Sequence, residues 1–333
     1  MAVKTTLQEE LLAAAPGRVR FNEPMRLHST FHIGGPAEVW AEPQQEEELQ
    51  RLFGIARQAD LSVTVVGGGA NLLVRDEGIP GLVVRLAGPG FQDFSVRSES
   101  FDLAAHPEPV EGRAASSGQA RRRASIEVHA GAALPLEWLI RRAQEAGLSG
   151  VEFLAGVPGR VGGAVRMNAG THDDEGETHS LGDILQSVRV MERSGQVRSI
   201  EAEKLHFRYR GCDLDGEIVL SAVLRLASED REAIARRVER LWEYKKRTQD
   251  WTAPSVGCIF KNPPGASAGR MIDQTGLKGY PMGGAAFSTK HANFIMNREN
   301  ASASDVSALI QEARARVLRQ FGVELELEVK VLP

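Results

Sequence analysis

Apolar residues recur along this chain at two spacings, which predict a mixture of helices and strands. Residues 45–58 place Leu49, Leu52, Phe53 and Ala56 three or four positions apart, the spacing that gives a helix one apolar face. Further helices are expected over 7–14 and from about residues 136, 228 and 302 onward. Short apolar stretches between glycines and prolines predict strands at 37–41, 62–66, 72–74, 81–86, 126–130, 186–192, 217–226 and 323–329.

The clearest helix signal lies near the end of the chain. Ser302 and Asp305 have the spacing of a capping box, an apolar face follows, and Gly322 marks the expected end. No internal repeat is present, so the sequence predicts an α+β protein. The length of 333 residues favours two domains, which we place at 1–228 and 229–333.

Residues 92–125 differ from the rest of the chain. They carry scattered proline, glycine, serine and alanine and three consecutive arginines at 121–123, without any period. We expect an exposed, mobile insertion, and a solvated loop is favoured over a polyanion-binding patch.

Composition excludes several classes of function. A net charge of −4 gives no reason to expect nucleic acid or an anionic membrane as partner. The N-terminus lacks the apolar run of a signal peptide, and no apolar run is long enough to span a membrane. The only cysteines, Cys212 and Cys258, form no disulfide framework. We therefore expect a cytoplasmic protein. We also favour a monomer.

Two glycine-rich stretches stand out. Residues 65–74 run from a strand into three glycines, whose exposed N–H groups suit a pyrophosphate, and residues 156–170 contain five glycines and no acidic residue. The first stretch does not match a Rossmann fingerprint and carries no Walker lysine. Plain turns remain the alternative for each. Together they favour an extended dinucleotide cofactor.

Other candidate residues are weaker when taken alone. Cys258 lies beside Gly257, Lys261 and Asn262, so its thiol could donate a proton, although a buried structural cysteine is the usual interpretation. Residues 171–179 hold two histidines and four carboxylates, but their spacing favours an exposed acidic turn over a metal site. No metal is expected.

Read together, these stretches resemble one family across nearly the whole chain except 92–125. Residues 30–37 are similar to the N-terminal signature of the UDP-N-acetylenolpyruvoylglucosamine reductases of bacterial cell-wall synthesis, the MurB family, and the two glycine-rich stretches resemble its flavin-binding loops. Later family blocks follow in the same order at 207–210, 257–263, 271–279, 283–286, 290–297 and 325–329.

The resemblance implies an FAD-binding domain of the p-cresol methylhydroxylase type, with lobes at about 1–86 and 87–228, followed by a smaller α+β substrate domain. It also implies NADPH-dependent reduction of the enolpyruvyl ether of UDP-N-acetylglucosamine to UDP-N-acetylmuramate, with FAD carrying the hydride. Short connections after Arg210 and Pro263 resemble the compact second type of the family, which lacks an extra substrate-covering loop.

Site residues follow from the matched blocks. Arg210 and Glu328 are expected to stabilise the enolic intermediate, and Cys258 to donate the proton where serine is usual in the family. The residues expected to bind FAD are Gly67, Gly68, Gly69, Ala70, Asn71, Leu72, Pro158, Gly159, Val161, Gly162, Gly163, Ala164, Asn168 and Gly170. The residues expected to bind the UDP-sugar are Arg247, Lys261 and Asn262.

Two other functions are compatible with this fold. A flavin- or nucleotide-binding protein without turnover is suggested by Cys258 and the long insertion, although Arg210 and Glu328 argue against it. A flavin oxidase with another substrate is opposed by the block around Cys258.

Overall fold

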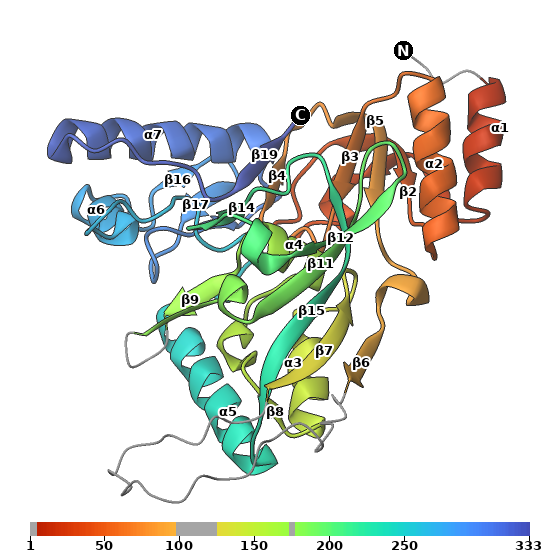
Figure 1. Ribbon diagram of the computed structural model, residues 1–333. Helices are drawn as coiled ribbons and strands as arrows, with labels where there is room; N and C mark the ends of the chain where they lie inside the picture. The colour runs from red at the N-terminus through yellow and green to blue at the C-terminus, as the bar shows by residue number, and fades with distance from the viewer. Residues whose placement is uncertain (1–4, 98–124, 173–176) are drawn as a thin grey trace, which may run out of the picture.

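The computed structural model describes residues 5–97, 125–172 and 177–333, which form three packed units (Figure 1). The largest apolar core lies in the first two units, and a second core lies in the C-terminal unit. A smaller core surrounds Trp40 in the first unit, and Leu332 from the end of the chain packs against it. Helices and mixed sheets alternate along the chain, so the expected α+β class is confirmed.

The first lobe is a four-stranded sheet in the order β1-β2-β5-β3, with two helices beside it (Figure 1). The β1–β2 pair is antiparallel, and β2, β5 and β3 run parallel. Helix α2 forms as the sequence predicts, because its apolar stripe is buried and three glutamates occupy its first turn. The elements are β1 (Val19–Pro24), β2 (Pro36–Ala41), β3 (Val63–Val66), β5 (Ile79–Arg85), α1 (Thr5–Ala14) and α2 (Glu46–Gln58).

The second lobe is an antiparallel sheet in the order β12-β11-β15-β7-β6, with β8 paired to the end of β15. Strand β15 lies at its centre and is mostly buried, as its apolar sequence requires. The strands are β6 (Phe94–Arg97), β7 (Ser125–Gly131), β8 (Leu148–Ser149), β11 (Leu185–Met191), β12 (Val197–Glu201) and β15 (Ile218–Ser228). Its helices are α3 (Leu136–Glu145), α4 (Val161–Arg166) and α5 (Arg231–Thr248).

Strand β6 corrects the start of the insertion expected at 92–125. Its residues pair with β7 from Phe94↔Ala130 to Arg97↔Glu127, so the regular sheet extends into that range. The remainder, residues 98–124, lies outside the described residues. A strand of 4 residues is too short to show a period in the sequence.

The C-terminal unit packs two helices against a three-stranded sheet in the order β16-β17-β18. Helix α7 begins with the expected capping box, in which Ser302 and Asp305 bond each other's backbone, and ends at Gly322 in the left-handed conformation. The elements are β16 (Pro281–Met282), β17 (Ala285–Phe287), β18 (Ile295–Asn297), α6 (Ala268–Gln274) and α7 (Ala303–Phe321).

The expected terminal strand at 323–329 is wrong in position. The regular strand is β19 (Lys330–Leu332), which runs parallel to β4 (Leu72–Val74) of the first lobe. Residues before it form a single bridge, Phe260↔Leu327, with flanking bonds from Lys261 N to Glu326 O and from Glu328 N to Ile259 O. A single bridge is too little pairing for a regular strand at 323–329, although exposed and more buried side chains alternate over 323–327, as the sequence suggests.

Short elements connect these units. Two small hairpins pair β9 (Gly170–His172) with β10 (Thr178–Ser180), and β13 (Phe207–Arg208) with β14 (Gly211–Cys212). Single 3₁₀ turns are η1 (Met25–Leu27), η2 (Pro89–Phe91), η3 (Glu152–Leu154), η4 (Leu181–Asp183) and η5 (Ala202–Lys204).

The first lobe and the C-terminal unit share one interface. Phe31, Ile33 and Leu73 of the first lobe belong to the C-terminal apolar core. The Asp76 carboxylate accepts hydrogen bonds from Ala303 N and Ser304 N at the start of α7. Helix α5 adds Leu241 to the larger core. The domain boundary at 228 remains a prediction.

Asp250 fixes the start of the segment that carries Cys258. This buried carboxylate accepts hydrogen bonds from the Thr252 hydroxyl and from the Ser288 hydroxyl, at 2.6 and 2.7 Å. Burial raises the pKa of Asp250, but these hydrogen bonds lower it by more, so the net pKa lies below the ordinary value.

We expect Asp250→Ala to reduce the free energy of unfolding at pH 7 by about 2 kcal/mol, since it leaves buried donors without an acceptor. A carboxyl group whose pKa is lowered by folding stabilises above its unfolded pKa of about 4, and this stabilisation is lost as pH falls. Urea unfolding of both proteins at decreasing pH should show the difference shrinking. Asp273→Ala, at an exposed ion pair with Lys278, is the control and should change little. An equal loss of unfolding free energy in Asp250→Ala and Asp273→Ala would contradict the stabilising role of Asp250.

Candidate active site

The turn between β13 and β14 places Arg210 in an uncommon backbone conformation. Its φ is 58°, a left-handed value that few residues other than glycine adopt. Residues held in such conformations are concentrated at functional sites, because the surrounding structure must stabilise them. Here the conformation belongs to an arginine that the sequence identifies as a catalytic candidate.

Arg210 and Glu328 form an ion pair across two units of the fold. Arg210 Nε donates to Glu328 Oε1 at 2.8 Å, and a terminal guanidinium nitrogen donates to the Gly170 carbonyl at 2.6 Å. The two side chains retain 22% and 14% of their exposure, so the pair is largely shielded from water. The structure therefore brings together two of the three expected catalytic residues.

Burial raises the pKa of Glu328, although the neighbouring Arg210 charge and hydrogen bond oppose the shift. The environment thus favours the neutral carboxyl group more than water does. A neutral carboxyl group can donate a hydrogen bond, which a carboxylate cannot.

Cys258 completes the group as a protonated thiol. Its backbone bridges to Phe294, and Glu328 N bonds to Ile259 O one residue further on. Burial raises the pKa of Cys258 to about 12, with the Glu328 charge acting in the same direction and Arg210 opposing. At neutral pH the thiol therefore holds its proton, which suits a proton donor and not a thiolate nucleophile.

Two residues that the sequence did not single out lie close to this group. Burial raises the pKa of Tyr209, which contacts the Asn262 backbone, and the charges of Glu328 and Cys258 add to the shift. Lys245 is buried and donates to the Ala155 carbonyl at 2.5 Å. Burial lowers the pKa of Lys245 to about 8, and the Arg210 charge adds to this shift. The spacing Leu241–Lys245, one helical turn, could have indicated that this lysine faces inward.

The two glycine-rich stretches lie directly against each other. A Cβ atom added to Gly68 would lie 3.1 Å from Gly159 Cα, and one added to Gly69 would lie 2.0 Å from the His28 carbonyl oxygen. Neither position accepts a side chain without movement, which explains the glycines. A cavity of about 200 Å³ opens beside them, lined in part by Gly67, Gly162 and Gly163.

The other residues expected to bind FAD occupy several environments. Val161 and Ala164 are buried in the larger core, and Leu72 lies in β4. Asn168 has φ 41° and accepts a hydrogen bond from Gly182 N at 2.9 Å. Asn71 donates to the Glu328 carbonyl at 3.1 Å, which connects the first loop to the catalytic pair. Ala70 is half-buried in the first loop, and Pro158 is exposed in the second.

The expected substrate-binding residues surround different parts of the site. Lys261 pairs with the exposed Glu326, and Asn262 accepts a hydrogen bond from Ala268 N at the start of α6. Arg247 is exposed in the last turn of α5, two residues after the buried Lys245. All three remain predictions.

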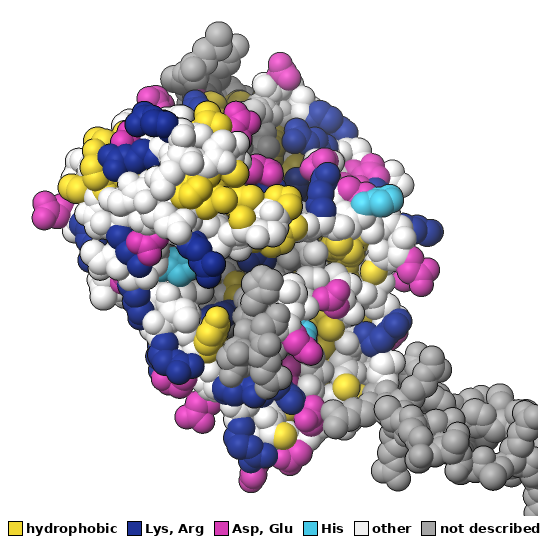
Figure 2. Space-filling model, turned by 90° about the vertical axis from the view of Figure 1, so that its left-hand side faces the viewer, with side chains coloured by type: hydrophobic (Ala, Val, Ile, Leu, Met, Phe, Trp, Pro, Cys, Tyr) yellow, Lys and Arg dark blue, Asp and Glu magenta, His cyan; other side chains and the backbone are white. Residues whose placement is uncertain are grey.

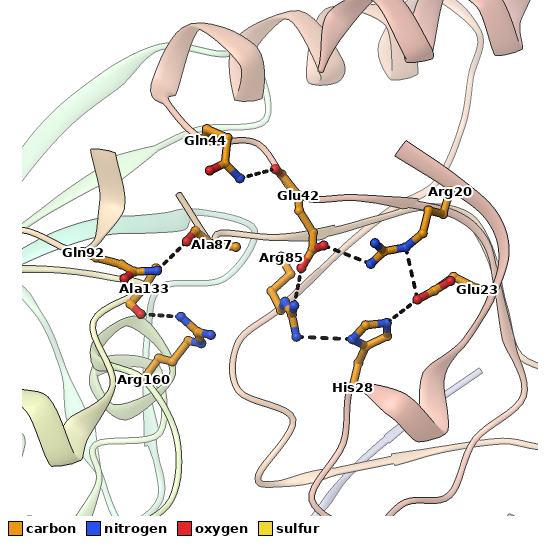
Figure 3. Close-up of polar contacts among 10 residues, drawn as sticks. All are labelled: Arg20, Glu23, His28, Glu42, Gln44, Arg85, Ala87, Gln92, Ala133 and Arg160. Carbon is orange, nitrogen blue, oxygen red and sulfur yellow. Dashed lines mark hydrogen bonds and ion pairs between the residues drawn. The ribbon is translucent and has the colours of Figure 1, made fainter. Parts of the chain in front are cut away.

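A polar network lies behind the first glycine loop (Figure 3). Glu42 accepts hydrogen bonds from Arg20 and Arg85, and His28 contacts both Glu23 and Arg85. Within the described chain, Arg85 Nε is buried without a hydrogen-bond partner. Arg160 lies on the other side of Arg85 and donates to the Ala133 carbonyl (Figure 3).

The surface carries charges of both signs. Acidic and basic side chains lie interspersed on the face drawn in Figure 2. Among the described residues, no group of three or more His, Cys, Asp or Glu side chains could hold a metal ion. Residues 173–176 of the acidic segment lie outside the described residues. No helix in the same ranges is long and apolar enough to cross a membrane.

Comparison with known proteins identifies the family. Residues 249–332 match the family model for the UDP-N-acetylenolpyruvoylglucosamine reductase C-terminal domain. A reductase of this name from Heliobacterium modesticaldum is 40% identical over 313 residues, covering 93% of this chain and 89% of the relative. The Bacillus subtilis reductase is 33% identical over 327 residues, covering 97% of both chains.

A solved structure agrees with these relatives. The crystal structure of the reductase (MurB) from Thermus caldophilus is 36% identical, covers 95% of this chain and 99% of its own, and superposes with a TM-score of 0.73. The fold expected from the sequence resemblance is thereby confirmed. The chain belongs to the UDP-N-acetylenolpyruvoylglucosamine reductase family.

Proposed function

We propose that this chain reduces the enolpyruvyl double bond of UDP-N-acetylglucosamine enolpyruvate with NADPH and FAD, giving UDP-N-acetylmuramate for peptidoglycan precursor synthesis. The observation that carries the proposal is the shielded Arg210–Glu328 pair with the Cys258 thiol beside it, in a chain of this reductase family. Cytoplasmic location, a monomeric state and the compact second type remain predictions.

The residues present fit a dinucleotide such as FAD. A Cβ atom at Gly67 or at Gly163 would meet no atom within 4 Å, so both loops are open to a ligand there, and the buried Arg85 Nε has no partner among the described residues. Gly67–Leu72 and the segment 158–170 would hold the cofactor, which supplies hydride transfer between NADPH and the substrate.

Arg210 stabilises negative charge that develops on the substrate. Hydride addition to the enolpyruvyl methylene carbon places an electron pair on the adjacent carbon, and this charge spreads into the carboxylate. A guanidinium group fixed by the Gly170 carbonyl and by Glu328 meets that charge without further reorganisation.

Glu328 and Cys258 complete the step. The neutral Glu328 carboxyl group, favoured by burial, donates a hydrogen bond to the developing enolate. The Cys258 thiol keeps its proton at neutral pH and delivers it to the carbon adjacent to the carboxylate. Lys261 and Asn262, with Arg247, bind the UDP-sugar.

The test of the reaction is NADPH oxidation by FAD-loaded protein with and without UDP-N-acetylglucosamine enolpyruvate. We expect oxidation that depends on this substrate, with one NADPH consumed for each product molecule. A flavoprotein that binds FAD but ignores the substrate would contradict the proposed function.

Cys258→Ala should leave reduction of the flavin by NADPH unchanged and slow the oxidation of reduced flavin by substrate about 10²–10⁴-fold, because the proton donor is lost. Cys258→Ser should keep much of the activity, since a hydroxyl group also donates a proton. Stopped-flow absorbance of the flavin separates the two half-reactions. An alanine variant with unchanged turnover would remove Cys258 from the mechanism.

Glu328→Gln should keep most of the substrate half-reaction, because the amide still donates a hydrogen bond, whereas Glu328→Ala should lose about 10²–10³-fold. The active form of Glu328 is protonated, so the wild-type rate falls as pH rises through its raised pKa, and Glu328→Gln should lack that fall. Rate–pH profiles of the second half-reaction measure this. Glu324→Gln, at an exposed position, is the control. An alkaline fall that persists in Glu328→Gln would refute the assignment.

A further inference from the structure

The cavity beside the glycine loops contains an arginine that belongs to neither the expected cofactor-binding set nor the catalytic group. Arg160 lines this cavity, and its Cγ lies 3.7 Å from the position that a Cβ on Gly68 would take. The start of its side chain therefore packs against the first glycine loop, although the residue belongs to the second.

The charge of Arg160 is not neutralised by the protein. Its one described hydrogen bond goes to the Ala133 carbonyl, and no carboxylate of the described chain lies within ion-pair distance of it. Burial lowers the pKa of Arg160, and the positive charge of Arg85 adds to the shift. Glu42 opposes the shift, but its carboxylate oxygens already bond Arg20 and Arg85. Arg20 and Arg85 thus share the Glu42 carboxylate, and Arg160 forms no ion pair with it.

Arg85, which neighbours Arg160, also has a hydrogen-bond donor without an acceptor among the described residues. Its terminal nitrogens contact Glu42 and His28, whereas its Nε is buried without a partner in the described part of the chain. A buried donor without an acceptor is costly unless a ligand supplies one. Figure 3 shows Arg160 and Arg85 as neighbours, and the Arg85 charge lowers the pKa of Arg160, so an anion bound at Arg160 would also be attracted by Arg85.

We propose that Arg160 binds the diphosphate of the dinucleotide cofactor, with Arg85 behind it as a second, fixed positive charge. The inference rests on the proposed function, because FAD is the cofactor proposed there. A planar guanidinium group matches two phosphate oxygens at once, and the glycine loops let the phosphates approach closely.

The other arginines of the cavity are less suited to this role. Arg166 donates to the Leu214 and Glu217 carbonyls and approaches Asp215 at 3.7 Å. Arg193 is exposed, so water and salt screen its charge. Arg160 is the member of the lining that is both shielded and without an acidic partner.

The test measures FAD affinity directly, by flavin fluorescence during titration of the cofactor-free, full-length protein. We expect Arg160→Gln to weaken FAD binding about tenfold or more at low salt, since a charge-assisted hydrogen bond is lost. Arg160→Lys should recover part of that affinity because the charge remains. Added salt should weaken wild-type binding more than Arg160→Gln binding.

Arg142→Gln removes the same charge from an exposed position outside the cavity, and should bind FAD as the wild type does. Equal FAD affinity in Arg160→Gln and wild type would overturn the inference while leaving the proposed function intact. Weaker binding with an unchanged salt dependence and no recovery by lysine would show a structural effect and also overturn it. A wild-type protein that binds no FAD would overturn both proposals.

Discussion

The three units of this structure meet at one residue, Glu328. Its side chain pairs with Arg210 of the second lobe, and its backbone carbonyl accepts a hydrogen bond from Asn71 of the first lobe. Its backbone N–H donates to Ile259, which neighbours Cys258 in the C-terminal unit. The position of the catalytic group relative to the glycine loops depends on these three bonds. Strand β19 starts two residues later and aligns with β4 immediately after the first loop.

Much of the fold could be predicted because its signals are local. The apolar stripe of α2 and the cap at Ser302 each arise within one short segment, so spacing and side-chain type suffice to find them. The glycine loops were also recognisable, because close backbone approach leaves glycine as the residue that fits. Arg210, Cys258 and Glu328 were identified only through family resemblance, since each looks ordinary in its own segment.

What sequence could not supply depends on contacts between distant segments. Lys245 faces inward because the Ala155 carbonyl lies beside it, ninety residues earlier in the chain. The pKa of Arg160 is lowered by burial and by the charge of Arg85 from the first lobe, and neither effect is visible in the residues that flank Arg160 in sequence. The terminal strand was misplaced for a similar reason: its partner is β4, and no pattern within 323–332 shows where pairing begins. Such features can be found only in the folded structure, since each depends on a contact between two residues that are distant in sequence.

The separation in sequence of the contacts at Glu328 has a consequence for folding. Asn71 and Glu328 lie 257 residues apart, and Arg210 and Glu328 lie 118 apart. Closing loops of this size carries an entropy cost before any contact rewards it, and topologies rich in such contacts fold slowly. The two lobes can collapse around their own core first, whereas the catalytic group assembles only when β19 docks beside β4. We therefore expect the active site to form late in folding, once all three units have folded together.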